Sequence, residues 1–183
     1  MWSISLRPDG LGLVTGSADK TCKFWDFDLV PSGGGDQLAL VHTRTLRMSD
    51  EVLSVKYSHT RAEEKVLLAV ALLDCTVKIF YADSLKFMLS LYGHKLPVLD
   101  MSISDDDTLI VTASADKNIR IWGLDFGDCH KSMFAHADSV TSVRFLPRTH
   151  LFVSGGKDGL LKCVPSSLRA SHACSSHVRT LAR

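Results

Sequence analysis

The sequence predicts an all-β protein that is built from a repeated unit of four short antiparallel strands. Ser-Ala-Asp-Lys occurs twice, at residues 17–20 and 114–117, and a tryptophan follows each aspartate by six residues. Short apolar stretches alternate with turn signals at a spacing of roughly 8–12 residues, which indicates an all-β fold. No segment longer than a turn has the periodicity of an amphipathic helix. These observations favour a repeat architecture over a mixed α/β domain.

An aspartate at the end of the second strand marks each unit. The intervals between these aspartates are 55, 42 and 42 residues, and the four residues are Asp19, Asp74, Asp116 and Asp158. The longer first interval leaves room for a Pro/Gly-rich loop at 30–37 and a long polar turn at 59–65. A histidine precedes the third and fourth aspartates by 22 residues, at His94 and His136.

The third unit shows each predicted element in order. An alternating stretch at 97–104 is followed by an acidic turn, and a near-continuous apolar strand follows at 109–115. A tight turn then leads to a third strand at 119–124, and a fourth occupies 130–136. By the same pattern we expect units at residues 1–47, 48–91, 92–134 and 135–164, with a divergent, disordered tail at 165–183.

A unit of 42 residues with four strands, an early His, and a late Asp and Trp resembles the WD40 repeat, which forms one blade of a β-propeller. This resemblance implies a buried polar quartet, in which the Trp indole donates to a Ser or Thr hydroxyl, the hydroxyl meets the His, and the Asp accepts from the His. In the third unit the implied quartet is His94, Ser114, Asp116 and Trp122.

The other units keep only part of this quartet. The first unit has Ser17, Asp19 and Trp25, whereas the second retains Asp74 and has Met48, Leu72 and Phe80 at the other positions. The fourth has His136 and Asp158, but Gly156 and Val164 interrupt the set. We therefore expect a partial WD40 propeller of three blades and part of a fourth, as in a truncated fragment that starts and ends inside blades.

A Ser–His–Asp trio also raises the possibility of a hydrolase. Catalytic serines need exposure and an oxyanion site, whereas these serines lie in strands at the repeat spacing beside a tryptophan. We therefore expect a protein that is not an enzyme and has no cofactor or small-molecule substrate. His172, Cys174 and His177 match no zinc-finger spacing, so no metal is expected.

The remaining composition gives few further signals. The net charge is +1, which gives little support to strong nucleic-acid binding. No apolar run is long enough for a membrane helix and the N-terminus does not resemble a secretory signal, so we expect an intracellular protein without membrane association. An odd number of cysteines indicates reduced, buried thiols, with Cys22 and Cys75 inside strands. The five are Cys22, Cys75, Cys129, Cys163 and Cys174.

Several segments point to a narrower family. The segments "YGHKLPVLDMSIS" at 92–104 and "WGLDFGDCHKS" at 122–132 resemble the WD repeat-containing protein three family, and "FLPRTHLFVSGGKD" at 145–158 agrees with them. These proteins are WD-repeat components of the small-subunit processome and the U-three small nucleolar ribonucleoprotein, and residues 1–162 resemble part of their second propeller. The tail after Lys162 does not resemble the family.

The resemblance implies a non-catalytic scaffold in ribosome biogenesis, acting in small-subunit pre-rRNA processing in the nucleolus of the nucleus. Its implied partners are other WD-repeat processome proteins and a small nucleolar RNA or pre-rRNA complex, with direct RNA contact left open. Lys20, Lys117 and Lys157 lie in the second-to-third-strand turns and are candidates for an interaction rim, although solvated lysines would fit the same pattern.

A generic WD40 adaptor, such as a substrate receptor of a ubiquitin ligase, is the alternative. Such receptors often end the third strand with "WDxR". The corresponding ends here are "WDFD", "FYAD" and "WGLD", and none of them carries the arginine.

Overall fold

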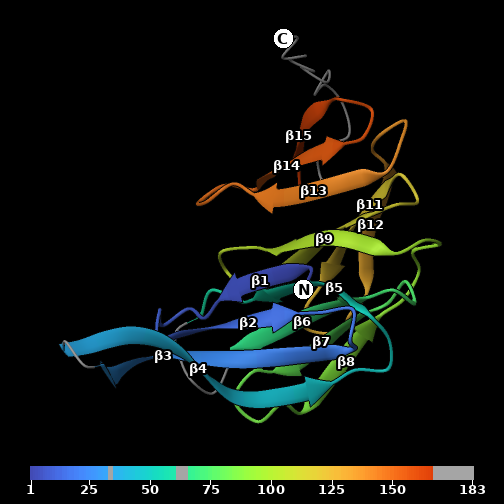
Figure 1. The fold of residues 1–183 in the computed structure, drawn as a ribbon. Helices are drawn as coiled ribbons and strands as arrows, with labels where there is room; N and C mark the ends of the chain where they lie inside the picture. Colours follow the sequence, from blue (N-terminus) through green and yellow to red (C-terminus); the bar gives the residue numbers. More distant parts are fainter. Residues whose placement is uncertain (33–34, 61–65, 167–183) are drawn as a thin grey trace.

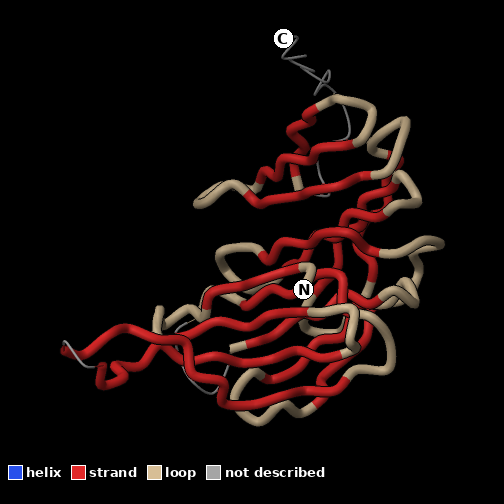
Figure 2. The backbone as a smooth tube through the Cα atoms, viewed as in Figure 1, coloured by secondary structure: helices blue, strands red, loops and turns tan. Residues whose placement is uncertain are grey.

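The computed structural model describes residues 1–32, 35–60 and 66–166, and all regular secondary structure in these ranges is β-strand (Figure 2). Fifteen strands form four antiparallel sheets, which we call sheets I to IV in chain order. Sheets I to III have four strands each and sheet IV has three among the described residues. The expected all-β fold of antiparallel propeller blades is confirmed.

Within each sheet the strands follow chain order, so each pairs with the next through a hairpin. Sheet I contains β1 (Ser3–Leu6), β2 (Gly12–Gly16), β3 (Thr21–Ser32) and β4 (Gly35–Arg47). Sheet II contains β5 (Val52–Tyr57), β6 (Leu67–Leu72), β7 (Val77–Tyr81) and β8 (Phe87–Leu91). Sheet III contains β9 (Val98–Ile103), β10 (Leu109–Ser114), β11 (Asn118–Gly123) and β12 (Cys129–Phe134). Sheet IV contains β13 (Val140–Phe145), β14 (Leu151–Gly156) and β15 (Leu161–Pro165).

The sheets lie face to face in sequence order, and the first strands β1, β5, β9 and β13 are neighbours along one inner edge (Figure 1). Each pair of adjacent sheets encloses an apolar cluster. The second strand of sheet II, with sequence LLAVAL, is buried along its whole length because sheets I and III cover its two faces. The outer strand β12, CHKSMF, has no fully buried residue, so apolar content falls from the inner strands to the outer edge.

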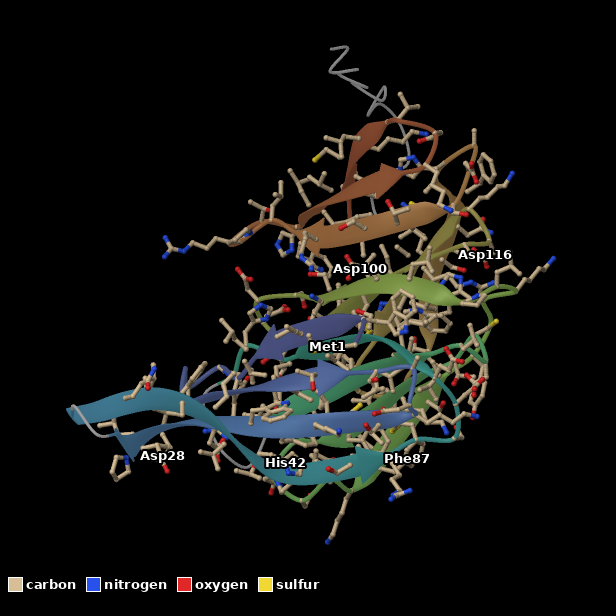
Figure 3. All side chains as sticks on the ribbon, in the orientation of Figure 1. Met1, Asp28, His42, Phe87, Asp100 and Asp116 are labelled. Carbon is tan, nitrogen blue, oxygen red and sulfur yellow. The ribbon has the colours of Figure 1, made fainter. Side chains whose placement is uncertain are left out.

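The Pro/Gly-rich loop expected at 30–37 is not a loop over most of its length. Strands β3 and β4 continue as a two-stranded ribbon in which Val30 pairs with Gln37 and Ser32 pairs with Gly35. Figure 1 shows this ribbon extending away from the stacked sheets, and Figure 3 labels Asp28 on it. Pro31 is tolerated because the ribbon has no third strand that would need its missing N–H.

Two further local expectations are corrected. Pro165, expected as the first residue of the divergent tail, is instead the final residue of β15 and pairs with Leu151. A proline is tolerated there because β15 is an edge strand of the described sheet. Cys75 lies in the turn between β6 and β7 rather than inside a strand. Most of the expected tail, residues 167–183, lies outside the described residues, and so do His172, Cys174 and His177.

The described cysteines are free thiols, but they are not uniformly buried as expected. Cys22 is buried in the cluster between sheets I and II, and burial raises the pKa of its thiol to about 12. Cys129 and Cys163 are exposed. In the described ranges, no helix could cross a membrane and no cluster of His, Cys, Asp or Glu could hold a metal ion.

The turn after the second strand uses the left-handed backbone region in every sheet. The residue that follows the marker aspartate has a positive φ of 64° at Lys20, 70° at Cys75, 71° at Lys117 and 78° at Gly159. This conformation costs a non-glycine residue about 1 kcal/mol or more, and only sheet IV supplies a glycine. The turn geometry therefore overrides residue preference in three of the four sheets.

We predict that Lys117→Gly stabilises the protein by about 0.5 kcal/mol, because relief of the left-handed strain exceeds the added flexibility of the unfolded chain. Lys117→Val should destabilise it, since a β-branched residue tolerates this region least. Urea unfolding of the two variants measures both effects. Equal stability of the glycine and valine variants would contradict the role given to the turn.

Candidate functional site

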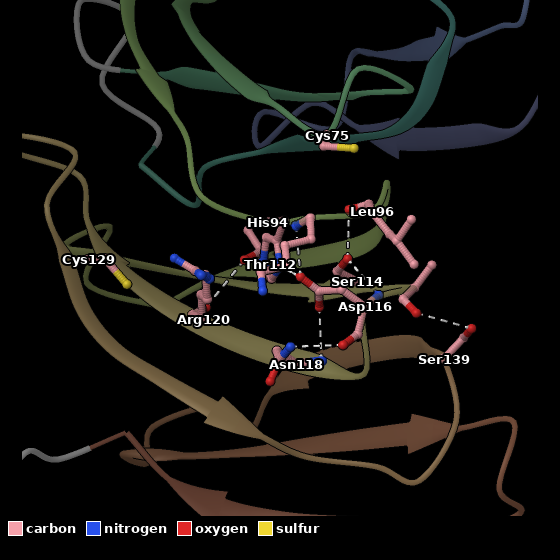
Figure 4. A network of polar contacts seen from close by, with 12 residues as sticks. Cys75, His94, Leu96, Thr112, Ser114, Asp116, Asn118, Arg120, Cys129 and Ser139 are labelled. Atoms are coloured by element: carbon pink, nitrogen blue, oxygen red, sulfur yellow. Dashed lines mark hydrogen bonds and ion pairs between the residues drawn. The ribbon is translucent and has the colours of Figure 1, made fainter.

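The most developed polar network of the described structure lies in sheet III (Figure 4). The Trp122 indole Nε1–H donates to Thr112 Oγ1 at 2.9 Å, and Thr112 Oγ1 lies 2.8 Å from His94 Nε2. On the opposite side of the ring, His94 Nδ1 lies 2.9 Å from Asp116 Oδ2. The His94 and Asp116 side chains are only 2% and 5% exposed, so this chain of polar groups is shielded from water.

When His94 is neutral, these groups form a chain of hydrogen bonds in which each group donates to the next. Nδ1–H donates to the Asp116 carboxylate, and Nε2 accepts the hydroxyl proton of Thr112, which in turn accepts from Trp122. Burial lowers the pKa of His94, and the Asp116 carboxylate offsets only part of this effect. Every buried member of this chain of hydrogen bonds therefore has a partner without an extra proton.

The Asp116 carboxylate also holds the surrounding backbone. It accepts from the backbone N–H groups of Lys95 at 3.0 Å and Asn118 at 3.0 Å. Burial alone would raise the pKa of Asp116, but the hydrogen bonds from His94 and these two N–H groups hold it below its ordinary value. The carboxylate thus fastens the turn after β10 to the segment that precedes β9.

The hydroxyl expected from Ser114 is supplied by Thr112 instead. Trp122 pairs with Ile110 across the β10–β11 ladder, so its indole N–H reaches the diagonal neighbour Thr112, two residues short of Ser114. Ser114 Oγ donates to the Leu96 carbonyl at 2.8 Å and accepts from the Asp116 N–H at 3.0 Å. Its contribution is to brace the turn.

The same correction applies to sheet I. The Trp25 indole donates to Thr15 Oγ1 at 3.0 Å, whereas Ser17 Oγ accepts from the Asp19 N–H at 3.3 Å. Asp19 Oδ1 accepts from the N–H of Thr21 at 3.0 Å and from its hydroxyl at 2.6 Å. Sheet I therefore has the Trp–Thr half of the network and the Asp turn as separate parts.

Sheet IV is more complete than the sequence indicated. His136 Nε2 lies 3.0 Å from Ser154 Oγ, and His136 Nδ1 lies 2.9 Å from Asp158 Oδ1. Gly156 does not interrupt this set, because a Cβ there would lie 2.6 Å from His136 Nδ1 and crowd the ring. Only the tryptophan is replaced, by Val164, which packs against the apolar cluster shared with sheet III.

Sheet II has an apolar version of the same site. Phe80 is buried, Met48 packs against the same cluster, and the hydroxyl position is Val70 rather than Leu72. Asp74 remains, and its Oδ1 accepts from the Thr76 N–H at 3.0 Å. The aspartate therefore persists because it shapes the turn, even where no histidine needs it.

The buried hydroxyls of this network are not available to a substrate. Thr112 and Ser114 are 0% exposed and Ser154 is 1% exposed. A nucleophile must reach a substrate carbonyl or phosphoryl group, which these positions prevent. The arrangement therefore stabilises the sheets.

The three candidate rim lysines are all exposed in the turns between the second and third strands. Lys20 Nζ lies 3.4 Å from Asp50 Oδ1. The Lys117 carbonyl accepts from the N–H groups of Ala135 at 3.0 Å and His136 at 3.3 Å, and the Lys157 N–H donates to the Ser139 carbonyl at 2.9 Å. The backbones of Lys117 and Lys157 are therefore fixed, and all three lysine side chains are exposed.

Comparison with known proteins gives a consistent pattern of similarity. The family model described as the WDR3 second beta-propeller domain matches residues 1–166. WD repeat-containing protein 3 from Homo sapiens is 59% identical over 100 residues, which cover 54% of this chain and 10% of that protein. The WD repeat-containing protein 3 homolog from Dictyostelium discoideum is 57% identical over 102 residues, with 54% of this chain and 10% of that protein covered.

U3 small nucleolar RNA-associated protein 12 from Saccharomyces cerevisiae is 54% identical over 108 residues, which cover 55% of this chain and 11% of that protein. The chain thus spans about a tenth of the length of these curated relatives.

We predict that Thr112→Val destabilises the protein by about 3 kcal/mol, because it leaves the Trp122 N–H and the His94 ring without their buried partner. Thr112→Ser keeps the hydroxyl and should recover most of the loss. Ser114→Ala should cost about 1 kcal/mol, since only the turn contacts disappear. Chemical denaturation measures all three, and a larger loss for Ser114→Ala would overturn the assignment of Thr112.

We also predict that stability falls as the pH is lowered below 6.5. The pKa of His94 is lower in the folded protein than its ordinary 6.5, so the unfolded chain takes up the proton first. The contribution of neutral His94 to the free energy of unfolding is complete above pH 6.5, and it is lost as the pH falls toward the pKa of His94 in the folded protein. Asp116 and Asp158, whose pKa values lie below 3.8, lose their contributions in the same direction at lower pH.

Urea unfolding at pH 7.5 and pH 5.5 tests this dependence. His94→Gln should show a smaller drop between the two pH values than the unmodified chain. His42→Gln, at an exposed histidine, is the control and should retain the full drop. An unchanged drop in His94→Gln would exclude His94 as its source.

Proposed function

Because the chain belongs to the family of the WDR3 second beta-propeller domain, we propose that it is a non-catalytic interaction scaffold in ribosome biogenesis. It acts in small-subunit pre-rRNA processing, in the nucleolus, within a small nucleolar ribonucleoprotein complex. Its partners are other WD-repeat proteins of that complex. The observation that carries the proposal is the family match over residues 1–166, nearly the whole described chain.

The relatives support the choice of complex. The Saccharomyces cerevisiae relative is named as associated with U3 small nucleolar RNA, and its matched segment is 54% identical to this chain. The matches to the human protein and to the yeast protein cover similar shares of this chain, 54% and 55%. The segment shared with both relatives therefore amounts to about half of this chain.

The structure supports a scaffold in physical terms. Buried networks centred on His94 and His136 join the turns of sheets III and IV to the neighbouring segments, so the loops are held on a rigid frame. On that frame Lys20, Lys117 and Lys157 present exposed ammonium groups at equivalent turns. We propose this row as the rim that meets acidic surfaces of partner proteins.

Association with U3 small nucleolar RNA tests the complex, and we predict that it is recovered with the chain. The epitope-tagged 183-residue chain is expressed in cells, the nucleolar fraction is isolated, and the RNA that precipitates with the chain is probed. Recovery of U3 RNA above that of an unrelated small nuclear RNA is expected. Nucleolar exclusion with no U3 RNA, or co-purification with a ubiquitin ligase instead, would overturn the proposal.

A pair of variants tests the rim. Lys117→Glu should reduce recovery of U3 RNA and of WD-repeat partners, because it reverses a charge on the proposed docking row. Lys86→Glu makes the same charge change at an exposed lysine in the β7–β8 turn and should have no effect. Equal recovery with both variants would remove the rim from the proposal without affecting the assignment to the complex.

A further inference from the structure

A cavity of about 340 Å³ lies at the inner edge of the stacked sheets, away from the lysine rim. It is formed where the ends of β1, β5 and β9 converge with β13, and its lining includes Lys56, Arg144 and three serines, of which Ser5 and Ser102 lie on the inner strands. Figure 3 labels Asp100, which lies on β9. The size falls within the range of roughly 300–1,000 Å³ that is usual for small-ligand sites.

Four of the lining side chains occupy one register position on the four inner strands. Ser5 is on β1, Lys56 on β5, Ser102 on β9 and Arg144 on β13. Two contacts between sheets fix this alignment. The Tyr57 N–H, next to Lys56, donates to Ser5 Oγ at 3.1 Å. The Phe145 N–H, next to Arg144, donates to Ser102 Oγ at 3.1 Å.

These contacts leave the serine hydroxyl protons free to donate. Each serine oxygen accepts a backbone N–H, and in the described part of the chain neither hydroxyl donates to an acceptor. A hydroxyl carries one donor as well as its acceptor sites. The cavity wall therefore presents two O–H donors that could meet an acceptor brought by a ligand.

The cationic groups of the cavity are only partly neutralised. Among residues 1–32, 35–60 and 66–166, no hydrogen bond or ion pair engages the Lys56 ammonium group. Burial and the nearby Arg144 charge lower the pKa of Lys56, which reflects the cost of an unpaired cation at this place. The Asp100 carboxylate on its own would raise the pKa of Lys56, but this carboxylate also has other partners.

The Asp100 carboxylate already has hydrogen-bond partners on sheet IV. Its Oδ2 accepts from Ser142 Oγ at 3.0 Å and from the Val143 N–H at 3.1 Å, and Arg144 Nη1 lies 3.2 Å away. Arg7, at the mouth, is held by Asp9 at 2.7 Å and by Asp26 at 2.8 Å. Lys56 therefore remains a cation without a dedicated anion.

We propose that this cavity binds a small phosphate-bearing anion, of the size of orthophosphate or pyrophosphate. Lys56 supplies the charge, the guanidinium of Arg144 supplies further N–H donors, and Ser5 and Ser102 donate their hydroxyl protons. Such an anion would satisfy the excess of donors that the wall presents. The inference is independent of the proposed function, because it concerns the opposite end of the strands and a different class of ligand.

Isothermal titration calorimetry tests the proposal. The full 183-residue chain is titrated with pyrophosphate at fixed ionic strength. One site per chain is expected, and Lys56→Gln should weaken binding roughly 10-fold or more, since a charge-assisted hydrogen bond is lost. Lys56→Arg should restore most of it. Lys157→Gln removes the same charge from the opposite rim and should leave the affinity unchanged.

A labelling experiment on the unmodified chain removes any dependence on the folding of variants. Acetic anhydride acetylates accessible amines, and mass spectrometry reports the rate at each lysine. Pyrophosphate should slow acetylation of Lys56 at least 3-fold and leave Lys157 unchanged. Equal rates with and without pyrophosphate, or protection of Lys56 by a single-stranded RNA oligonucleotide but not by pyrophosphate, would overturn the small-anion site.

These outcomes are separable from those of the scaffold proposal. If the chain does not bind pyrophosphate, the cavity proposal fails. The scaffold proposal is then still decided by whether the tagged chain recovers U3 RNA. Conversely, pyrophosphate binding by a chain that recovers no U3 RNA would support the cavity and contradict the complex.

Discussion

The contact on which the rest of this structure depends is the hydrogen bond from a turn N–H to the marker aspartate two residues earlier. It is present in all four sheets, at Asp19, Asp74, Asp116 and Asp158, with N–O distances of 3.0 to 3.1 Å. It fixes a turn that forces the next residue into the left-handed region. That turn sets the register of the second and third strands, and so determines which side chains face the adjacent sheets.

The histidine network is an addition to this turn, and its loss is tolerated under one condition. In sheet II the other three members of the network are replaced together, by Met48, Val70 and Phe80, so no buried donor of the network is left unpaired. In sheet I the Trp25 indole still donates to Thr15 Oγ1. A sheet can therefore exchange the network for apolar packing, whereas removal of one member from the complete network of sheet III leaves buried groups without partners.

The sequence predicted the architecture because the spacing of four aspartates is a long-range signal that does not depend on any single side chain. It failed for the hydroxyl, because Thr112 and Ser114 are two residues apart on β10 and therefore point to the same face. Only the diagonal reach of Trp122 distinguishes them, and that depends on the pairing register. A signal was available in sheet IV, where glycine stands at the Ser114 position and Ser154 four residues before the aspartate.

The cavity could not have been found from the sequence, because its residues share no motif. Ser5, Lys56, Ser102 and Arg144 differ in type, and only the packing of inner strands brings them to one level. The two ends of the strands thus follow different rules. At the end with the marker turns, each repeat needs the same aspartate for its turn, whereas the residue that follows the aspartate differs between sheets. At the opposite end the repeat imposes no residue type, so individual positions are free to acquire charge and, with it, a ligand.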